Sequence, residues 1–234
     1  ALGAGDRTAD GDEILLSVHT GDLKVLDESN RIVRIHGGAK SVEVVVGTDD
    51  LLGRRAIRNV DEKKIIAQKI LSKIRPHSTV YLDSGSTTTM LAEIWPDQPN
   101  YIFTNSLSCA MELSKLEKPM VFMPGGELNT YSMSLCGVQA IESIKNVNFD
   151  MAIIGVTNYS SDCGFTCGVL MESYLKQAVL KQANDKMILM DSSKIGKKST
   201  FNICSLGDVD MVVMDENVPE SFRKECEEAG MPLI

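Results

Sequence analysis

Val80-Tyr81-Leu82-Asp83-Ser84-Gly85-Ser86-Thr87-Thr88-Thr89 passes from apolar to small polar residues, and the rest of the chain can be organised around it. Three apolar residues end on an acid, and a turn of small residues follows. Apolar side chains then recur at helical spacing, at Met90, Leu91, Ile94 and Trp95. This pattern predicts a strand, a tight loop and a helix.

The loop of this unit is suited to hold a phosphate. The backbone N–H groups of Ser84 to Thr87 would lie at a helix N-terminus, where unpaired donors and the positive end of the helix dipole favour an anion. The hydroxyl groups add further donors, and Asp83 would border the pocket. Alternatively, Ser84 or Ser86 simply caps the helix, and this stretch alone favours neither interpretation.

Length and composition set the frame for the whole chain. With 234 residues and 43% hydrophobic content, it can bury one substantial core, or a main domain with a small appendage, without metals or disulfides. The net charge is −8 and the pI is near 5.0, so the overall field repels nucleic acid. Any contact with DNA therefore needs a local basic patch or an additional segment.

The cysteines and the hydrophobic runs indicate a cytoplasmic protein. Six cysteines are scattered along the chain, and Cys163 and Cys167 do not have the spacing of a redox or zinc motif. No apolar run approaches the roughly 18 to 20 residues that span a bilayer. The acidic, glycine-rich residues 1–13 do not resemble a signal peptide. We therefore expect reduced thiols and no contact with a membrane.

The N-terminal part of the sequence differs from the remainder. Residues 1–13 are small, polar and acidic and are expected to be disordered, whereas 14–26 have a short apolar pattern that predicts a helix. From Arg31 to Gly38, basic and apolar residues alternate before a glycine turn, which predicts a basic hairpin arm or a solvated amphipathic strand. Residues 40–60, which contain Arg54, Arg55 and Arg58, are interpreted as a linker to a main domain over 61–234.

The main domain alternates between two patterns. Short apolar, β-branched runs predict strands at 80–83, 101–104, 119–123, 151–156, 186–190 and 211–214, with a possible edge strand at 232–234. Helical periodicity predicts helices at 61–74, 86–95, 106–116, 134–146, 170–184 and 219–229. Because the strands are continuously apolar, we predict an α/β fold whose mainly parallel sheet is covered by helices on both faces.

Ligands of such sheets gather at the carboxyl ends of the strands, beside a topological switch point. Polar or glycine turns follow five predicted strands, at Asp83–Thr88, Thr104–Ser106, Pro124–Gly126, Gly155 and Asp191–Gly196. Together they favour a polyhydroxylated anionic ligand over plain turn chemistry. Lys194 stands between an aspartate and a glycine, where its charge can meet a phosphate. For Glu172 and Lys176, four residues apart, spacing alone favours an ordinary ion pair on a helix surface.

Taken in order, these residues resemble the sugar-phosphate sensor domain of DeoR-family bacterial transcription regulators. The matching positions are Glu62–Ala67, Asp83–Thr88, Thr104–Ser106, Gly125, Gly126, Gly137, Gly164–Thr166, Glu172, Lys176, Asp191–Lys194 and Gly196. Upstream, Asp22–Leu26 and Arg34–Ala39 resemble the end of a recognition helix and the wing of a winged helix-turn-helix. The resemblance spans about 22–234, and the order and spacing of its motifs are more specific than any single one.

The resemblance implies a Rossmann-like fold shared with ribose-5-phosphate isomerase and coenzyme A transferases, used for sensing rather than catalysis. It implies an oligomeric repressor of a sugar-catabolic operon that leaves operator DNA when a phosphorylated sugar binds. Residues Ser84 to Thr88 would hold the phosphate. Further contacts with the effector would come from Asp83, Thr104, Asn105, Gly125, Gly126, Glu172, Lys176 and Lys194.

The N-terminal segment departs from the family pattern. Thr20 and Gly21 stand where the recognition helix usually carries an arginine pair, and two preceding helices are not recognisable in residues 1–17. Residues 1–39 are therefore interpreted as a partial winged helix-turn-helix. Because too few phosphate contacts remain, we expect this chain by itself to lack sequence-selective operator binding.

Two other functions compete with sensing. One is an isomerase or deaminase acting on sugar phosphates, with Asp83 or Glu172 as general base and Lys194 stabilising an enediolate. The histidines are His19, His36 and His77, so residues 78–234 hold no Ser/His/Asp arrangement and no histidine-based metal site. The other is nucleotide binding, but neither GxGxxG nor GxxxxGK[ST] occurs. We expect neither a metal nor an organic cofactor.

Overall fold

The computed structural model describes residues 32–35, 38–41 and 51–234. The chain divides into two compact units, Ala1–Thr48 and Asp49–Ile234. In the first unit, β1 (Ile32–Ile35) and β2 (Gly38–Ser41) form an antiparallel hairpin; β1 lies in the stretch predicted as a hairpin arm, and β2 extends past it to Ser41. The predictions for 1–13, the helix at 14–26 and the recognition-helix residues Thr20–Leu26 lie outside the described residues.

The second unit is built on a six-stranded sheet, and every pairing in it is parallel. Its strands, in spatial order, are β13 (Met211–Val213), β11 (Ala183–Leu189), β8 (Phe149–Gly155), β3 (Thr79–Leu82), β4 (Tyr101–Thr104) and β5 (Met120–Phe122). All six overlap the strands predicted from apolar runs, so the predicted parallel α/β fold is confirmed.

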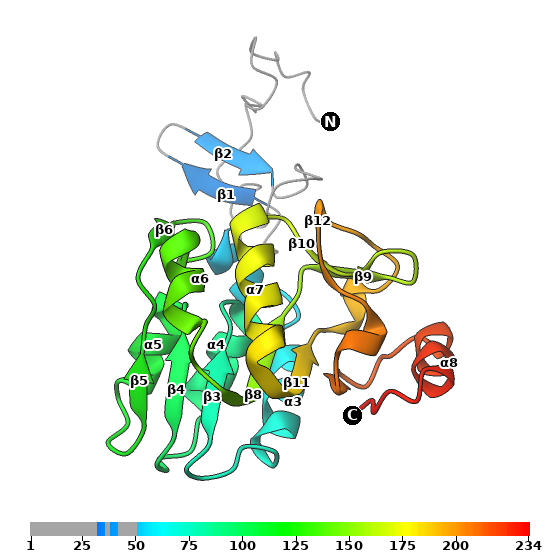
Figure 1. Cartoon of the computed structure of the whole chain (residues 1–234). Helices are drawn as coiled ribbons and strands as arrows, with labels where there is room; N and C mark the ends of the chain where they lie inside the picture. Colours follow the sequence, from blue (N-terminus) through cyan, green and yellow to red (C-terminus); the bar gives the residue numbers. More distant parts are fainter. Residues whose placement is uncertain (1–31, 36–37, 42–50) are drawn as a thin grey trace. The chain divides into compact units, whose positions relative to one another are not determined.

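Helices cover both faces of this sheet (Figure 1). Alternate residues of β8 contribute to two hydrophobic clusters, one on each face of the sheet. Met151 and Ile153 pack with α3 (Val60–Leu71), α4 (Ser86–Glu93) and α5 (Leu107–Leu113). Ala152 and Ile154 pack on the opposite face. That face is covered by α6 (Val138–Ile144), α7 (Leu170–Gln182) and α8 (Glu220–Glu228). The sheet is therefore buried on both faces, as its continuous apolar strands require. None of the helices in the described residues has the length and apolar character needed to cross a membrane.

The strand order reverses at β3, so that β3 and β8 lie side by side at a topological switch point. From β3 the chain proceeds to β4 and β5, and it then returns to pair β8 with the other side of β3 before adding β11 and β13. A switch point of this kind leaves a crevice at the carboxyl ends of the two central strands. The loops after β3 and β8 therefore meet at the place where a ligand site is expected.

Several short elements were not predicted. The helix expected at 134–146 begins only at Val138, because Ser134–Cys136 is a strand, β7, that pairs with β6 (Glu127–Asn129). A separate antiparallel sheet contains β9 (Asn158–Ser160), β10 (Gly164–Cys167) and β12 (Phe201–Cys204), and two 3-10 helices, η1 (Ser192–Lys194) and η2 (Leu206–Asp208), lie near it in sequence. A short helix, α2 (Leu52–Ala56), lies within the stretch interpreted as a linker. At the C-terminus, Leu233 forms a parallel bridge to Val212, in the stretch proposed as an edge strand.

Candidate functional site

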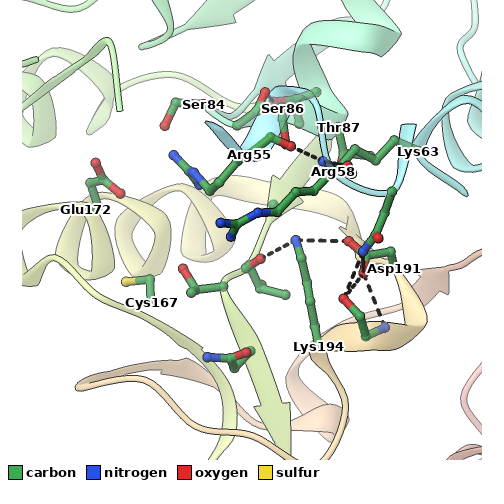
Figure 2. A pocket seen from close by; sticks show the side chains of 18 of the residues that line it. Arg55, Arg58, Lys63, Ser84, Ser86, Thr87, Cys167, Glu172, Asp191 and Lys194 are labelled. Carbon is green, nitrogen blue, oxygen red and sulfur yellow. Dashed lines mark hydrogen bonds and ion pairs between the residues drawn. The ribbon is translucent and has the colours of Figure 1, made fainter. Parts of the chain in front are cut away.

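A cavity of about 180 Å³ opens at the carboxyl ends of β3 and β8 (Figure 2). Its walls are the loop that begins α4, the residues that follow β8, the η1 turn, one face of α7, and the chain that leads into α3. The lining residues are Arg55, Arg58, Asn59, Lys63, Ser84–Thr88, Gly155–Asn158, Cys167, Glu172, Lys176, Asp191, Ser193, Lys194 and Lys197. The structure thus brings together eight of the sequence-predicted residues, namely Ser84–Thr88, Glu172, Lys176 and Lys194.

The N-terminus of α4 faces this cavity without a side-chain cap. Gly85, which has no side chain, occupies the capping position, and no side-chain capping hydrogen bond is formed there. By contrast, the Ser106 hydroxyl caps α5 by accepting a 3.1 Å hydrogen bond from the Cys109 N–H. The alternative that Ser84 or Ser86 caps α4 is therefore wrong. The free amide donors suit an anion.

Positive charge dominates the lining of the cavity. Six basic side chains and two carboxylates line it, in a chain whose net charge is −8. The basic side chains are Arg55, Arg58, Lys63, Lys176, Lys194 and Lys197, and the acids are Glu172 and Asp191. Among the described residues, no three His, Cys, Asp or Glu side chains are grouped as a metal ion would require. The cavity is thus a local exception to the acidic surface, suited to an anionic ligand.

Lys194 places its amine at the edge of the cavity. Its Nζ donates a 2.7 Å hydrogen bond to the carbonyl oxygen of Val156 and lies 3.9 Å from Asp191 Oδ2. Burial lowers the pKa of Lys194 to about 8, with Asp191 opposing the shift and the cations Arg55, Lys63 and Lys176 adding to it. The amine is therefore held by a neutral carbonyl, with Asp191 as an ion-pair partner beyond hydrogen-bond distance.

Asp83 and Lys176 form a buried ion pair beneath the cavity, with side chains that are 1% and 5% exposed. Asp83 Oδ2 also accepts a 3.0 Å hydrogen bond from Gly155 N–H, and Lys176 Nζ donates at 3.1 Å to the Gly155 carbonyl. Burial opposes the charge of Lys176, but the carboxylates of Asp83 and Glu172 together raise its pKa. In the ligand-free structure, Asp83 thus supports the floor of the cavity and does not line it.

Glu172 connects the cavity to the hairpin of β6 and β7. Its Oε1 accepts hydrogen bonds from Ser132 Oγ at 2.6 Å, Asn129 Nδ2 at 3.2 Å and Ser134 Oγ at 3.3 Å. Glu172 and Lys176 are both buried, so the expectation of an ordinary surface pair is wrong. Spacing along a helix gives the separation of two side chains but not whether a neighbouring hairpin covers them.

Four sequence-predicted residues lie away from the cavity. Thr104 Oγ1 accepts from Ser106 N–H at 3.1 Å, and Asn105 Nδ2 donates to the Leu135 carbonyl at 3.1 Å, so both brace the turn after β4. Gly125 and Gly126 lie against α6. A Cβ at Gly126 would stand 2.4 Å from the Cys136 carbonyl oxygen, so this glycine permits close approach of two backbones.

Sequence reasoning missed the contribution of residues just before α3 and in its first turn. Arg55, Arg58, Asn59 and Lys63 all line the cavity, and Figure 2 shows the two guanidinium groups between the Ser84–Thr87 loop and Lys194. The basic cluster was visible in the sequence, but it stood in a stretch interpreted as a linker. Long-range contacts, such as that from Asn59 to Asp191, 132 residues away, reveal that this stretch folds onto the site.

Comparisons with known proteins place the chain among transcription regulators. The family profile of the DeoR C terminal sensor domain matches residues 58–216. The chain is similar to the glycerol-3-phosphate regulon repressor of Escherichia coli (strain K12), with 30% identity over 87% of this chain and 80% of that protein. It is also similar to the HTH-type transcriptional regulator GolR of Listeria innocua, with 29% identity over 94% of this chain and 87% of that protein. Among solved structures, eIF2B delta from Chaetomium thermophilum shares the fold at a TM-score of 0.51 and 8% identity, over 68% of this chain and 57% of that one.

Proposed function

Since the chain belongs to the DeoR family of transcriptional regulators, we propose that its cavity binds a phosphorylated sugar as the effector of a repressor. The target of repression would be an operon for sugar catabolism. The family's members in these comparisons are named regulators and repressors rather than enzymes. On this function, the cavity binds its ligand and releases it unchanged.

The observation that carries the proposal is the uncapped N-terminus of α4 in a cavity lined by six cations. A phosphate seated there would accept from backbone N–H groups and from the hydroxyls of Ser86 and Thr87. It would also meet the positive end of the helix dipole. Such charge-assisted hydrogen bonds are shorter and about twice as strong as neutral ones. A phosphate monoester thus fits this end of the cavity better than a neutral sugar.

The two carboxylates of the cavity provide acceptors for sugar hydroxyls. Glu172 uses Oε1 for the β6–β7 hairpin, which fixes its side chain. Asp191 is held by Asn59 Nδ2 at 3.0 Å and by the Ser193 N–H at 3.2 Å. Carboxylates that are oriented in advance by other groups can select hydroxyl positions, because a misplaced hydroxyl leaves a buried acceptor unpaired.

The domain organisation is proposed from the same family membership. Residues 1–39 would supply a partial winged helix-turn-helix for operator DNA, 40–60 a linker, and 61–234 the effector domain. The Escherichia coli relative is named for glycerol-3-phosphate, a phosphorylated polyol, which agrees with a ligand of this class. As in the family resemblance, the working protein would be a homo-oligomer.

A thermal-shift screen of pentose, hexose and triose phosphates, each beside the same sugar without phosphate, tests the proposal. A true effector at 100 times its Kd should stabilise the folded chain by about 2.7 kcal/mol. The unphosphorylated partner should give little shift. Phosphorus NMR after long incubation should recover the effector unchanged, whereas turnover near 1 per second would indicate an enzyme. Equal binding of both members of every pair would contradict the proposal.

A further inference from the structure

Residues 52–59, here called the arginine segment, are anchored to the effector domain at both ends. At its start, the Leu52 N–H donates a 2.8 Å hydrogen bond to the carbonyl of Tyr131, in the loop of the β6–β7 hairpin. At its end, Asn59 Nδ2 donates at 3.0 Å to both Asp191 Oδ1 and Ser193 Oγ. The second anchor lies in the η1 turn, which carries Lys194 in the cavity wall, and the first lies in the hairpin that holds the lining residue Glu172.

Lys63 fixes the turn between these anchors. Its buried amine donates to the backbone carbonyls of both Arg55 and Arg58. Asn59 adopts a left-handed conformation, with φ of 50°, which turns the chain from this segment into α3. The consequence is visible in Figure 2, where the guanidinium groups of Arg55 and Arg58 both extend into the cavity.

This arrangement gathers positive charge on one side of the cavity. Arg55 and Lys63 both disfavour the protonated form of Lys194 through their charges. In addition, Nε of Arg55 is buried and meets no acceptor among the residues that the structure describes. A buried donor without a partner is uncommon, and a bound oxyanion would satisfy it.

We propose that Arg55 and Arg58 bind the anionic group of the ligand opposite the N-terminus of α4, and that ligand binding locks the arginine segment onto the cavity. This inference rests on the proposed function and adds to it the element that responds to the ligand. The neutralised charge and the newly paired Nε supply the differential interaction that such a switch needs.

Calorimetric titration of the full chain with inorganic phosphate tests the contacts. Arg55→Ala and Arg58→Ala should each weaken phosphate binding at least about tenfold, in the range of a lost charge-assisted hydrogen bond. Arg54→Ala is the matched control. It changes the net charge as Arg55→Ala does, on the same helix, but Arg54 does not line the cavity. It should bind within about twofold of the unchanged chain. Arg55→Lys keeps the charge and separates loss of charge from loss of the guanidinium fork.

Hydrogen exchange tests the locking. Amides of residues 52–63 should exchange more slowly with saturating phosphate than with chloride at equal ionic strength. Asn59→Gly, which removes the side-chain anchor and keeps the left-handed turn, should bind phosphate yet lose most of that protection. Phosphate binding that ignores both arginines, or unchanged exchange in the segment, would overturn this inference and leave the proposed function standing. Failure of the unchanged chain to bind phosphate or any sugar phosphate would overturn both.

Discussion

Lys194 donates a 2.7 Å hydrogen bond from its amine to the carbonyl oxygen of Val156 and thereby joins the turn after β11 to the end of β8. These two strands are neighbours in the sheet, so the bond spans the edge where the cavity opens. The nearest carboxylate, Asp191, stands 3.9 Å away, beyond a hydrogen bond. Lys194 is therefore positioned by a neutral group, and its charge is available to a ligand.

Removing this amine should weaken binding of a phosphosugar without unfolding the protein. For Lys194→Ala we expect a loss of about 1.5 to 3 kcal/mol in binding free energy, the usual range for a hydrogen bond to a charged group. The free energy of unfolding should not fall, because a lysine with a lowered pKa does not stabilise the fold through its charge. Titration calorimetry and urea unfolding measure the two quantities.

Lys198→Ala is the control for that experiment. Lys198 lies 3.6 Å from Asp162 at the surface, with a side chain that is 64% exposed, and it does not line the cavity. Its replacement should leave the Kd unchanged. Equal weakening by both substitutions would point to the overall field of the protein rather than to a contact made by Lys194.

Binding of a phosphate monoester should depend on pH through Lys194. Burial lowers the pKa of this amine to about 8, so the charged form is complete well below pH 8 and is lost above it. Affinity should fall between pH 8 and 9.5 and level off at the value for Lys194→Ala. Lys194→Arg should abolish the decline, because a guanidinium stays charged throughout this window. A decline that persists in Lys194→Arg would assign the titration to another group.

The stability of the free protein should change with the opposite sign. Since the folded pKa of Lys194 is about 8 and its ordinary value is 10.5, the unfolded chain holds more protons between these limits. The free energy of unfolding should therefore gain a contribution from Lys194 as pH rises through that window. Comparing urea midpoints of the unchanged chain and Lys194→Ala across pH 7 to 10 isolates this contribution.

Breaking the ion pair of Asp83 and Lys176 should destabilise the fold strongly. Each single replacement, Asp83→Asn or Lys176→Met, leaves a buried charge without its partner, which costs about 3 to 5 kcal/mol. The double variant should recover much of that loss, because it buries neither charge of the pair. Urea unfolding of all four proteins gives the coupling energy. Simple addition of the two single losses would show that the pair does not act as a unit.

Two glycines with similar backbone angles should differ in their tolerance of alanine. Gly164 has φ of 72°, and a Cβ there would lie 2.4 Å from the Cys204 carbonyl oxygen, whereas Gly196 has φ of 74° and open space around it. Gly196→Ala should cost about 1 to 2 kcal/mol from the left-handed backbone alone. Gly164→Ala should cost about 1 to 3 kcal/mol more, because strands β10 and β12 must separate. Equal losses in urea unfolding would contradict the close approach.

The main sheet could be predicted because its strands are buried on both faces. Runs such as Met151 to Ile154 are apolar at every position, and that signal does not depend on which element covers them. The small antiparallel sheet gave no such signal. Its strand Asn158–Ser160 is short and mostly polar, and the pairing of Phe165 with Cys204 joins residues far apart in the chain. Contacts of that range are decided by tertiary packing.

The same distinction applies to the cavity. The loop after β3 could be predicted because strand, turn and helix follow one another within the quoted stretch. The contribution of Arg55 and Arg58 could not, since it depends on Asn59 reaching Asp191 and on Lys63 holding two backbone carbonyls. Likewise, the buried position of Lys176 follows from its pairing with Asp83, 93 residues earlier, and not from the helix that carries it.

The reversal of the chain between β3 and β8 has a consequence for synthesis of the protein. Contacts that build the cavity join Asp83 to Lys176 and Asn59 to Asp191, so its walls come from both halves of the sensor domain over 58–216. A nascent chain that has not yet released residue 194 lacks one of those walls. A ligand that binds only the finished cavity stabilises the finished fold and slows its unfolding, without assisting earlier steps. On the proposed function, the regulator would therefore not respond to an effector until translation of this domain is nearly complete.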